Sequence, residues 1–180
     1  MSNSTTTLAT NSNETVDDVA ELVHNFDWAS TPLGPMDSWP RWLKFVTNLC
    51  LNTAYPMVLY IGEDRIFIYN QMWVPLIQAN HPCIGTSATL TYPEARDFLV
   101  PLFNAALRGE GKYIEDFCPY VIRSGYKEEA YFTWTLSPIY TDTGEIGGLI
   151  SLATETTEKV LTNRRLKMFR DLANGTQGNY

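Results

Sequence analysis

Positive charge is scarce in this sequence of 180 residues, where 13 Lys and Arg stand against 20 Asp and Glu. A surface that binds nucleic acid needs clustered Lys and Arg, so we expect no nucleic-acid partner. Three cysteines are too few for a disulfide scaffold, and they form no Cys-Xaa-Xaa-Cys pair that would indicate a metal site. No secretory leader opens the chain, and no apolar run approaches the roughly 20 residues of a membrane span. These absences predict a cytoplasmic protein without a membrane segment.

The stretch from Ala54 to Asn70, AYPMVLYIGEDRIFIYN, predicts a β-hairpin. Two runs of β-branched and aromatic residues, Pro56–Ile61 and Ile66–Tyr69, flank a polar turn at Gly62–Arg65. A two-stranded hairpin alone is marginal in water, so further strands must come from elsewhere in the chain.

Residues 113–122, 129–140 and 146–153 predict those further strands, and Pro93–Leu107 predicts a helix before them. Apolar and polar residues alternate along the strand at 129–140, which indicates one buried face and one polar face. The expected fold class is therefore α+β. It has a five-stranded antiparallel sheet with short helices on one face, flanked by an N-terminal and a C-terminal helix.

The part of the chain before the hairpin divides in two. Residues 1–15 are polar and should form a disordered tail, whereas residues 16–53 should form a helical cap with a Pro- and Trp-rich loop. We expect the second helix of this cap to end near residue 52 and to bury four residues, Trp42, Phe45, Val46 and Leu49. The core domain is then residues 54–154, and residues 155–180 form an output helix with the start of a linker.

The C-terminal helix, predicted at 155–173, follows the last strand without a turn residue between them. Its apolar residues lie in two stripes on a polar background: Leu161, Met168 and Leu172 in one, Leu166 and Phe169 in the other. A helix this polar is not stable on its own in water. It should pair with a copy of itself or with the N-terminal helix, which predicts a homodimer through the terminal helices.

Several short motifs together resemble the PAS sensor domains found near the N-terminus of bacterial and fungal histidine kinases. The matching residues are Asp27-Trp28, Thr31-Pro32-Leu33-Gly34-Pro35, Trp39-Pro40, Tyr69-Asn70, His81-Pro82 with Gly85, Tyr92-Pro93-Glu94, Glu115-Asp116, Gly125-Tyr126, Tyr131-Phe132-Thr133 and Ser137-Pro138. The resemblance covers about residues 26 to 173, and the joint set is specific although each motif alone is weak.

This resemblance implies a signal-input domain of a two-component phosphorelay, without catalysis of its own, that governs a histidine kinase further along the natural chain. Thr154, Glu155, Thr156 and Thr157 stand where PAS sensors carry a short hinge into the output helix. Neither a phospho-acceptor His region nor a nucleotide-binding fold is present in these 180 residues. Further sensor and kinase domains are expected after residue 180.

Cofactor signatures of this family are missing. A haem needs an axial ligand, usually on the helix before the third strand, and Pro93–Leu107 contains no His. A flavin light sensor would carry an Asn-Cys-Arg-Phe-type motif after the hairpin, where this chain has Gln71-Met72-Trp73-Val74-Pro75. We therefore expect neither haem nor flavin and no metal. The chain has two histidines, His24 and His81, and His81, which is followed by Pro in a turn, is expected to be structural.

Among the cysteines, Cys50 and Cys118 should be buried small hydrophobic residues, on a helix and in a strand. Cys83 lies in a loop beside His81 and is the one cysteine with a case for redox reactivity. The carboxylate pairs Glu115-Asp116 and Glu128-Glu129 could suggest acid–base chemistry. Neighbours on a strand point to opposite faces, however, so these residues should face solvent or pair with Arg123 and Lys127.

A cavity between sheet and helices would be lined by bulky residues, namely Met57, Trp73, Leu102, Phe117 and Trp134. These side chains either fill the core outright or surround a small molecule, with Asn70, Thr133 and Thr135 as polar anchors if they face inward. Three classes remain open: a ligand- or redox-responsive input domain, a PAS domain used only for dimerisation and relay, and a small enzyme. The enzyme is disfavoured because no nucleophile–base or metal set is present.

Overall fold

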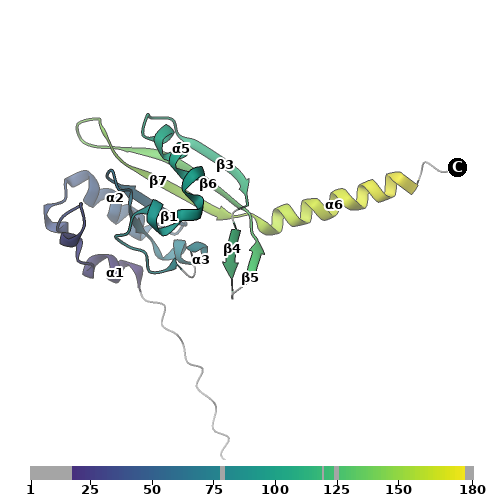
Figure 1. The fold of residues 1–180 in the computed structure, drawn as a ribbon, viewed down its shortest axis with the longest axis horizontal. Coiled ribbons are helices and arrows are strands. Elements are labelled where there is room, and N and C mark those ends of the chain that lie inside the picture. The colour runs from purple at the N-terminus through teal and green to yellow at the C-terminus, as the bar shows by residue number, and fades with distance from the viewer. Residues whose placement is uncertain (1–17, 78–79, 119, 124–125, 177–180) are drawn as a thin grey trace, which may run out of the picture.

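The computed structural model describes residues 18–77, 80–118, 120–123 and 126–176, and an antiparallel sheet forms its centre (Figure 1). The strands are β1 (Met57–Ile61), β2 (Ile66–Tyr69), β3 (Lys112–Phe117), β4 (Tyr120–Arg123), β5 (Tyr126–Glu129), β6 (Phe132–Tyr140) and β7 (Ile146–Glu155). Five of them form one sheet in the order β2-β1-β7-β6-β3, and β4 pairs with β5 alone. The predicted α+β class and five-stranded antiparallel sheet are confirmed. The tail predicted at residues 1–15 lies outside the described residues.

Short helices cover the sheet, and one long helix leaves it (Figure 1). The α-helices are α1 (Val19–Asn25), α2 (Arg41–Asn52), α3 (Val74–Ile77), α4 (Ala88–Thr91), α5 (Arg96–Ala106) and α6 (Thr157–Thr176). The 3-10 helices are η1 (Trp28–Ser30), η2 (Met36–Ser38), η3 (Gln71–Trp73) and η5 (Pro93–Ala95). The predicted helix at Pro93–Leu107 is thus a 3-10 turn followed by α5.

The β1–β2 hairpin is covered on both faces, because every residue of both strands is buried. Tyr60 of β1 contacts Phe103 of α5, with ring centroids 5.0 Å apart, so Tyr60 marks the face under α5. We call this the inner face. The opposite, outer face of the hairpin is covered by α2, which also packs on both strands.

Strand β6 has one buried face and one face that is only half-buried. Phe132, Trp134 and Leu136 are buried, whereas the intervening Thr133 and Thr135 are half-buried. Trp134 contacts Phe98 of α5, which places the apolar side of β6 on the inner face. The predicted alternation is therefore confirmed.

The N-terminal cap docks through aromatic rings, as predicted for its Pro- and Trp-rich loop. Trp28 and Trp39 are buried with ring centroids 4.9 Å apart, and Phe26 lies over Gly85. A Cβ atom at Gly85 would approach the Phe26 ring to 2.2 Å, and Gly85 also adopts a φ of +76°. Both the close contact and the backbone conformation require glycine there.

One sequence prediction about the strands is wrong. The strand expected at 113–122 is divided into β3 and β4, and β4 pairs with β5 in a separate hairpin, whereas the strand expected at 129–140 is β6 with a later start at Phe132. The pairing of β3 with β6 shifts register between Ile114 and Phe117, and Asp116 between them has a φ of +47°. This irregularity ends the regular ladder before the chain reaches β4.

The buried face of α2 also differs from the prediction. The helix buries Leu43, Val46, Thr47 and Cys50, whereas Phe45 and Leu49 are exposed and Trp42 is half-buried. Apolar residues surround most of this helix, so periodicity alone did not identify the side that packs on the sheet.

Candidate functional site

Two of the predicted cavity residues, Phe117 and Trp134, lie beside Phe98 of α5 on the inner face. Trp134 and Trp73 are buried, and Leu102 and Phe117 are half-buried against the core. The Phe117 ring stacks on Phe98 at 4.3 Å with an interplanar angle of 3°. These contacts place aromatic rings between α5 and the β6–β3 side of the sheet, with Phe98 36% exposed.

Two of the predicted lining residues point the other way. Met57 lies three residues before Tyr60 on a regular strand, so it faces outward under α2. Thr133 is the neighbour of Trp134 and likewise faces outward, where its hydroxyl donates to Asp116 Oδ1 and accepts from the Asp116 N–H. The prediction that these two residues line one cavity with Trp134 is wrong, because side chains alternate along a strand.

Asn70, the expected polar anchor, uses all of its hydrogen-bonding groups on the backbone. Its Oδ1 accepts from the N–H groups of Met57 and Trp73, both at 3.1 Å, and its Nδ2 donates to the carbonyls of Thr53 and Tyr55. The residue is 1% exposed. Asn70 therefore joins the start of β1 to η3 and leaves nothing for a ligand.

Aromatic packing continues through the rest of the inner face. The Tyr60 ring also contacts Phe67 at 5.3 Å, and Phe67 contacts Tyr92 edge-on at 6.0 Å. Ser151 is an exception, since its buried hydroxyl has no hydrogen-bond partner among the described residues and pairs across the sheet with Val58 of the inner face. Sequence reasoning missed Ser151, because a lone Ser in a strand carries no signal.

Two shallow hollows of the described surface lie on the N-terminal cap. The larger, of about 400 Å³, is lined by Asp18, Glu21, Leu22, Asn25, Phe26 and Asp27. The other, of about 250 Å³, is lined by His24, Met36, Asp37, Trp39, Lys44, Thr47, Asn48 and Leu51. None of the predicted cavity residues lines either hollow.

Cys83 lies in a buried polar cluster. The Tyr69 hydroxyl accepts from the Cys83 N–H at 3.0 Å and bonds the His81 ring at 2.8 Å. Burial raises the pKa of the Cys83 thiol to about 11, with a smaller opposing effect of the Tyr69 hydroxyl. A thiol with a raised pKa is mostly protonated at neutral pH, which argues against the redox reactivity suggested by its loop position.

The other two cysteines differ from each other. Cys50 is fully buried, as predicted, and burial raises its pKa to about 12. Cys118 is exposed and lies just after β3, so the prediction that it is buried in a strand is wrong. The break in the ladder at Asp116 removes this residue from the sheet.

The hinge residues Thr154–Thr157 make polar contacts to the sheet on both sides of the junction. The hydroxyls of Thr154 and Tyr55 are hydrogen-bonded, and Thr157 Oγ1 donates to Glu155 Oε1. The Tyr131 backbone, just before β6, donates from its N–H to Thr157 Oγ1 at 2.9 Å. Its carbonyl accepts from the Thr156 N–H at 2.7 Å. The backbone of Tyr131 therefore holds both Thr156, just before α6, and Thr157, the first residue of α6.

Asp116 forms a second attachment, which sequence reasoning missed. Its carboxylate accepts from Thr156 Oγ1 at 2.7 Å and lies 3.8 Å from the Lys159 ammonium. Lys159 also pairs with Glu115 at 3.3 Å, and these carboxylates raise the pKa of Lys159, Glu115 first. We call Asp116, Thr133, Thr156 and Lys159 the Asp116 cluster. The left-handed backbone at Asp116 is the feature that turns its carboxylate toward the hinge.

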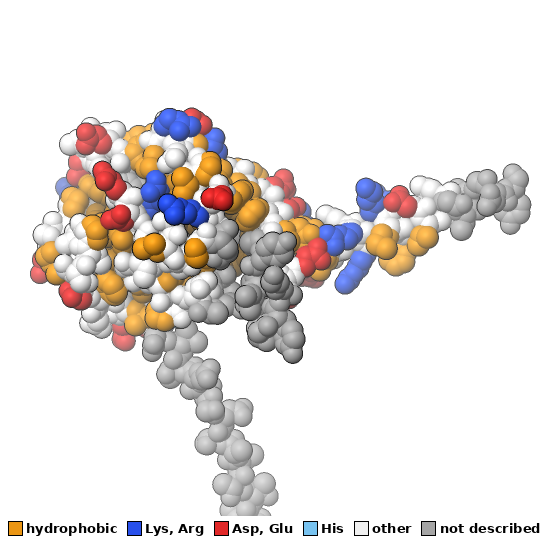
Figure 2. Space-filling view, viewed as in Figure 1, with side chains coloured by type: hydrophobic (Ala, Val, Ile, Leu, Met, Phe, Trp, Pro, Cys, Tyr) orange, Lys and Arg blue, Asp and Glu red, His pale blue; other side chains and the backbone are white. Residues whose placement is uncertain are grey.

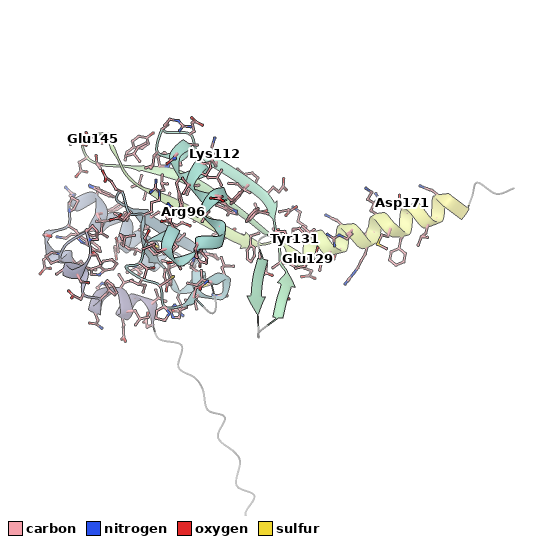
Figure 3. All side chains as sticks on the ribbon, viewed as in Figure 1. Arg96, Lys112, Glu129, Tyr131, Glu145 and Asp171 are labelled. Atoms are coloured by element: carbon pink, nitrogen blue, oxygen red, sulfur yellow. The ribbon has the colours of Figure 1, made fainter. Side chains whose placement is uncertain are left out.

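A third attachment lies one turn further along α6. Arg164 pairs with Glu129 at 2.9 Å and donates to the Tyr131 hydroxyl at 2.7 Å, while that hydroxyl donates to Glu129. The hydrogen bond from Tyr131, followed by that from Arg164, lowers the pKa of Glu129. We call Glu129, Tyr131 and Arg164 the Tyr131 cluster; its first two members are labelled at the base of α6 in Figure 3.

The carboxylates at 115, 116 and 129 were expected to face solvent or to pair with Arg123 and Lys127. Glu115 and Glu129 do face solvent, with 58% and 47% of their side chains exposed. The three carboxylates also have cationic partners on α6, because the chain direction after Glu155 brings Lys159 and Arg164 beside them. Pairing with Arg123 and Lys127 stays a prediction. Within the described part of the chain, no three His, Cys, Asp or Glu residues come together in a way that could hold a metal ion. No described helix is long and apolar enough to cross a bilayer.

This architecture is that of known PAS structures. The PAS domain of BvgS from Bordetella pertussis is 17% identical, with a TM-score of 0.51, over 73% of this chain and 98% of that one. Phage VqmA in complex with DPO is 19% identical with a TM-score of 0.52, over 71% of this chain and 58% of that one. An RNA-binding light-oxygen-voltage receptor is 18% identical with a TM-score of 0.50, over 83% of this chain and 43% of that one.

The chain therefore has the PAS fold, as its sequence resemblance implied. It spans less than two thirds of the length of two of these three structures. Neither the known protein-family models nor the curated proteins contain a match to the sequence.

Proposed function

We propose that this chain is the sensory input domain of a cytoplasmic histidine kinase, and that it passes a change in the sheet to α6 without catalysis of its own. The kinase and further sensor domains would follow residue 180 in the natural protein. Two such domains would act as a dimer through their terminal helices.

The contacts at the base of α6 carry this proposal. The helix follows β7 after the single residue Thr156, and it is attached to β3 through Asp116 and to the segment before β6 through Tyr131. Through these contacts a movement of β3, or of the segment before β6, would act on the first turns of α6. Glu155 and Thr157 close the junction by bonding to each other, and replacing both with Ala should uncouple sensing from kinase activity in the full-length protein.

A dimerisation and relay domain without a ligand is the second candidate. The aromatic contacts of Tyr60, Phe67, Phe98 and Phe117 support it, since these rings lie against one another on the inner face. The unpartnered hydroxyl of Ser151 favours a bound molecule, because a buried hydroxyl is normally hydrogen-bonded. The two candidates differ in whether the purified domain retains a small molecule.

Native mass spectrometry beside an absorbance spectrum separates the candidates. A mass excess that disappears on denaturation supports the ligand-responsive domain, whereas the bare polypeptide mass supports relay alone. We expect neither haem nor flavin in either case, so a Soret band or a 450 nm flavin absorption that survives gel filtration would contradict that expectation.

Sedimentation of the chain with and without residues 160–180 tests the dimer. We expect the shortened chain to keep the circular dichroism of its sheet and to dissociate at higher concentration than the full chain. Equal dissociation constants for the two proteins would refute dimerisation through α6.

A further inference from the structure

Helix α6 presents apolar side chains that the described body does not cover. Leu166, Met168, Phe169 and Leu172 are between 52% and 69% exposed. Figure 2 shows orange hydrophobic side chains among blue Lys and Arg side chains where the helix stands clear of the body. An exposed helix of this kind marks an interaction surface.

The charge of α6 is opposite to that of the rest of the chain. Five basic and two acidic residues give the helix a formal charge of +3 in a protein of −7, so the other residues together carry −10. Lys159 and Arg164 bond the chain's own sheet, whereas Arg165, Lys167 and Arg170 make no ion pair among the described residues. The outer turns of α6 are thus cationic as well as apolar.

The position of Arg165 on the helix indicates which kind of partner surface α6 can pack against. It lies four residues from Leu161 and from Phe169, so it projects from within the apolar side of the helix. Two α6 helices packed in parallel and in register through this side would bring two Arg165 guanidinium groups together. A partner surface with apolar residues beside carboxylates would satisfy both the Arg165 charge and the apolar side chains.

The larger hollow on the N-terminal cap has this composition. Leu22 and Phe26 are half-buried within it, and the carboxylates of Glu21 and Asp27 at its rim form no ion pair among the described residues. Figure 1 shows α1 on the side of the body away from α6, and the contacts of Arg164 fix the direction in which α6 leaves. The helix therefore cannot reach the hollow of its own chain.

We propose that the basic, apolar side of α6 docks into the acidic hollow between α1 and η1 of a second copy of this chain. A two-fold axis makes this contact twice, with each helix, about 30 Å long, crossing the cap of the other copy. The inference rests on the proposed dimer and specifies which surfaces form it.

Paired charge reversals in the full chain test this docking by sedimentation. The helix set is the single change Arg165→Glu on the apolar side of α6, and the cap set is Glu21→Lys with Asp27→Lys. Each set alone should weaken dimerisation by about tenfold or more at low salt, and a chain carrying both sets should recover most of the loss, because opposite charges face each other again. The matched control, Glu63→Lys with Asp64→Lys in the β1–β2 turn, makes the same charge change away from the contact and should recover nothing of the helix-set loss.

The outcomes distinguish this inference from the proposed function. The docking would be overturned if the cap set leaves the dissociation constant of the dimer unchanged while removal of residues 160–180 still raises it. In that case the proposed dimer through α6 would remain supported. A combined chain no tighter than the single sets would also overturn the docking. A wild-type chain that stays monomeric yet binds vesicles of phosphatidylserine and phosphatidylcholine would overturn both and assign α6 to a lipid surface.

Discussion

Asn70 offers the sharpest test of how the inner face is built. The structure assigns this 1% exposed side chain four hydrogen bonds to backbone groups of residues 53, 55, 57 and 73. Truncation to alanine leaves these groups without the amide, although the Trp73 N–H keeps a bond to the Asn70 carbonyl. With a net value of about 1 kcal/mol for each of the three bonds lost outright, Asn70→Ala should lower the free energy of unfolding by about 3 kcal/mol.

Urea unfolding followed by Trp fluorescence measures this loss. Asn52→Ala is the matched control, because the Asn52 amide bonds Asn48 on the exposed side of α2 and should contribute less than about 0.5 kcal/mol. Asn70→Asp keeps the two acceptor bonds but places a carboxylate against two carbonyls, so it should also be destabilised. An Asn70→Ala protein as stable as the wild type would refute the structural role and return Asn70 to the list of ligand anchors.

Three further changes have defined outcomes. Trp134→Ala removes a large buried side chain that contacts Phe98 and should cost about 3–5 kcal/mol in urea unfolding, so an unchanged midpoint would place Trp134 on the surface. Iodoacetamide should label Cys118 in the folded protein and the two buried cysteines only after unfolding, as mass spectrometry of the peptides will show. Because the folded-state pKa of Glu129 is lowered below 4.5, its pairing with Arg164 stabilises the fold at higher pH and is lost as the pH falls through that folded-state value. The Arg164 side-chain NMR signal should therefore move only in acid, and a transition above pH 4.5 would contradict the pairing.

Much of the fold could be predicted from the sequence because its strongest signals are local. The hairpin at 57–69, the alternation in β6 and the direct passage from β7 to the last helix all follow from residue pattern and turn chemistry. The break at Asp116 could not be predicted in this way. It depends on a left-handed backbone at a non-glycine residue and on partners 40 residues or more away in sequence, Thr156 and Lys159.

The site was predicted less well for the same reason. Bulky residues near the hairpin identified Trp73 and Trp134 as inner-face or core side chains, but the sequence did not identify the outward direction of Met57. The sequence identified Asn70 as a residue that ends a strand, and the structure shows that both polar atoms of its side-chain amide are hydrogen-bonded to the backbone in this role. Tyr131 was noticed only as part of the Tyr131-Phe132-Thr133 motif, and its pairing with Arg164 was not predicted, because their contact exists only once α6 has left the sheet at a particular angle.

The direction of α6 is the central claim, and a spin-label distance measures it most directly. Labels at Asp97 on α5 and Asp171 near the end of α6, in a Cys118→Ser chain diluted with unlabelled protein, report the angle between helix and body. The wild type should give one narrow distance distribution, as should the control Glu158→Gln in the first turn. Thr156→Val with Arg164→Gln removes contacts from the Asp116 and Tyr131 clusters and should broaden the distribution. An equally narrow distribution at the same distance in that variant would show that these contacts do not set the direction of the helix.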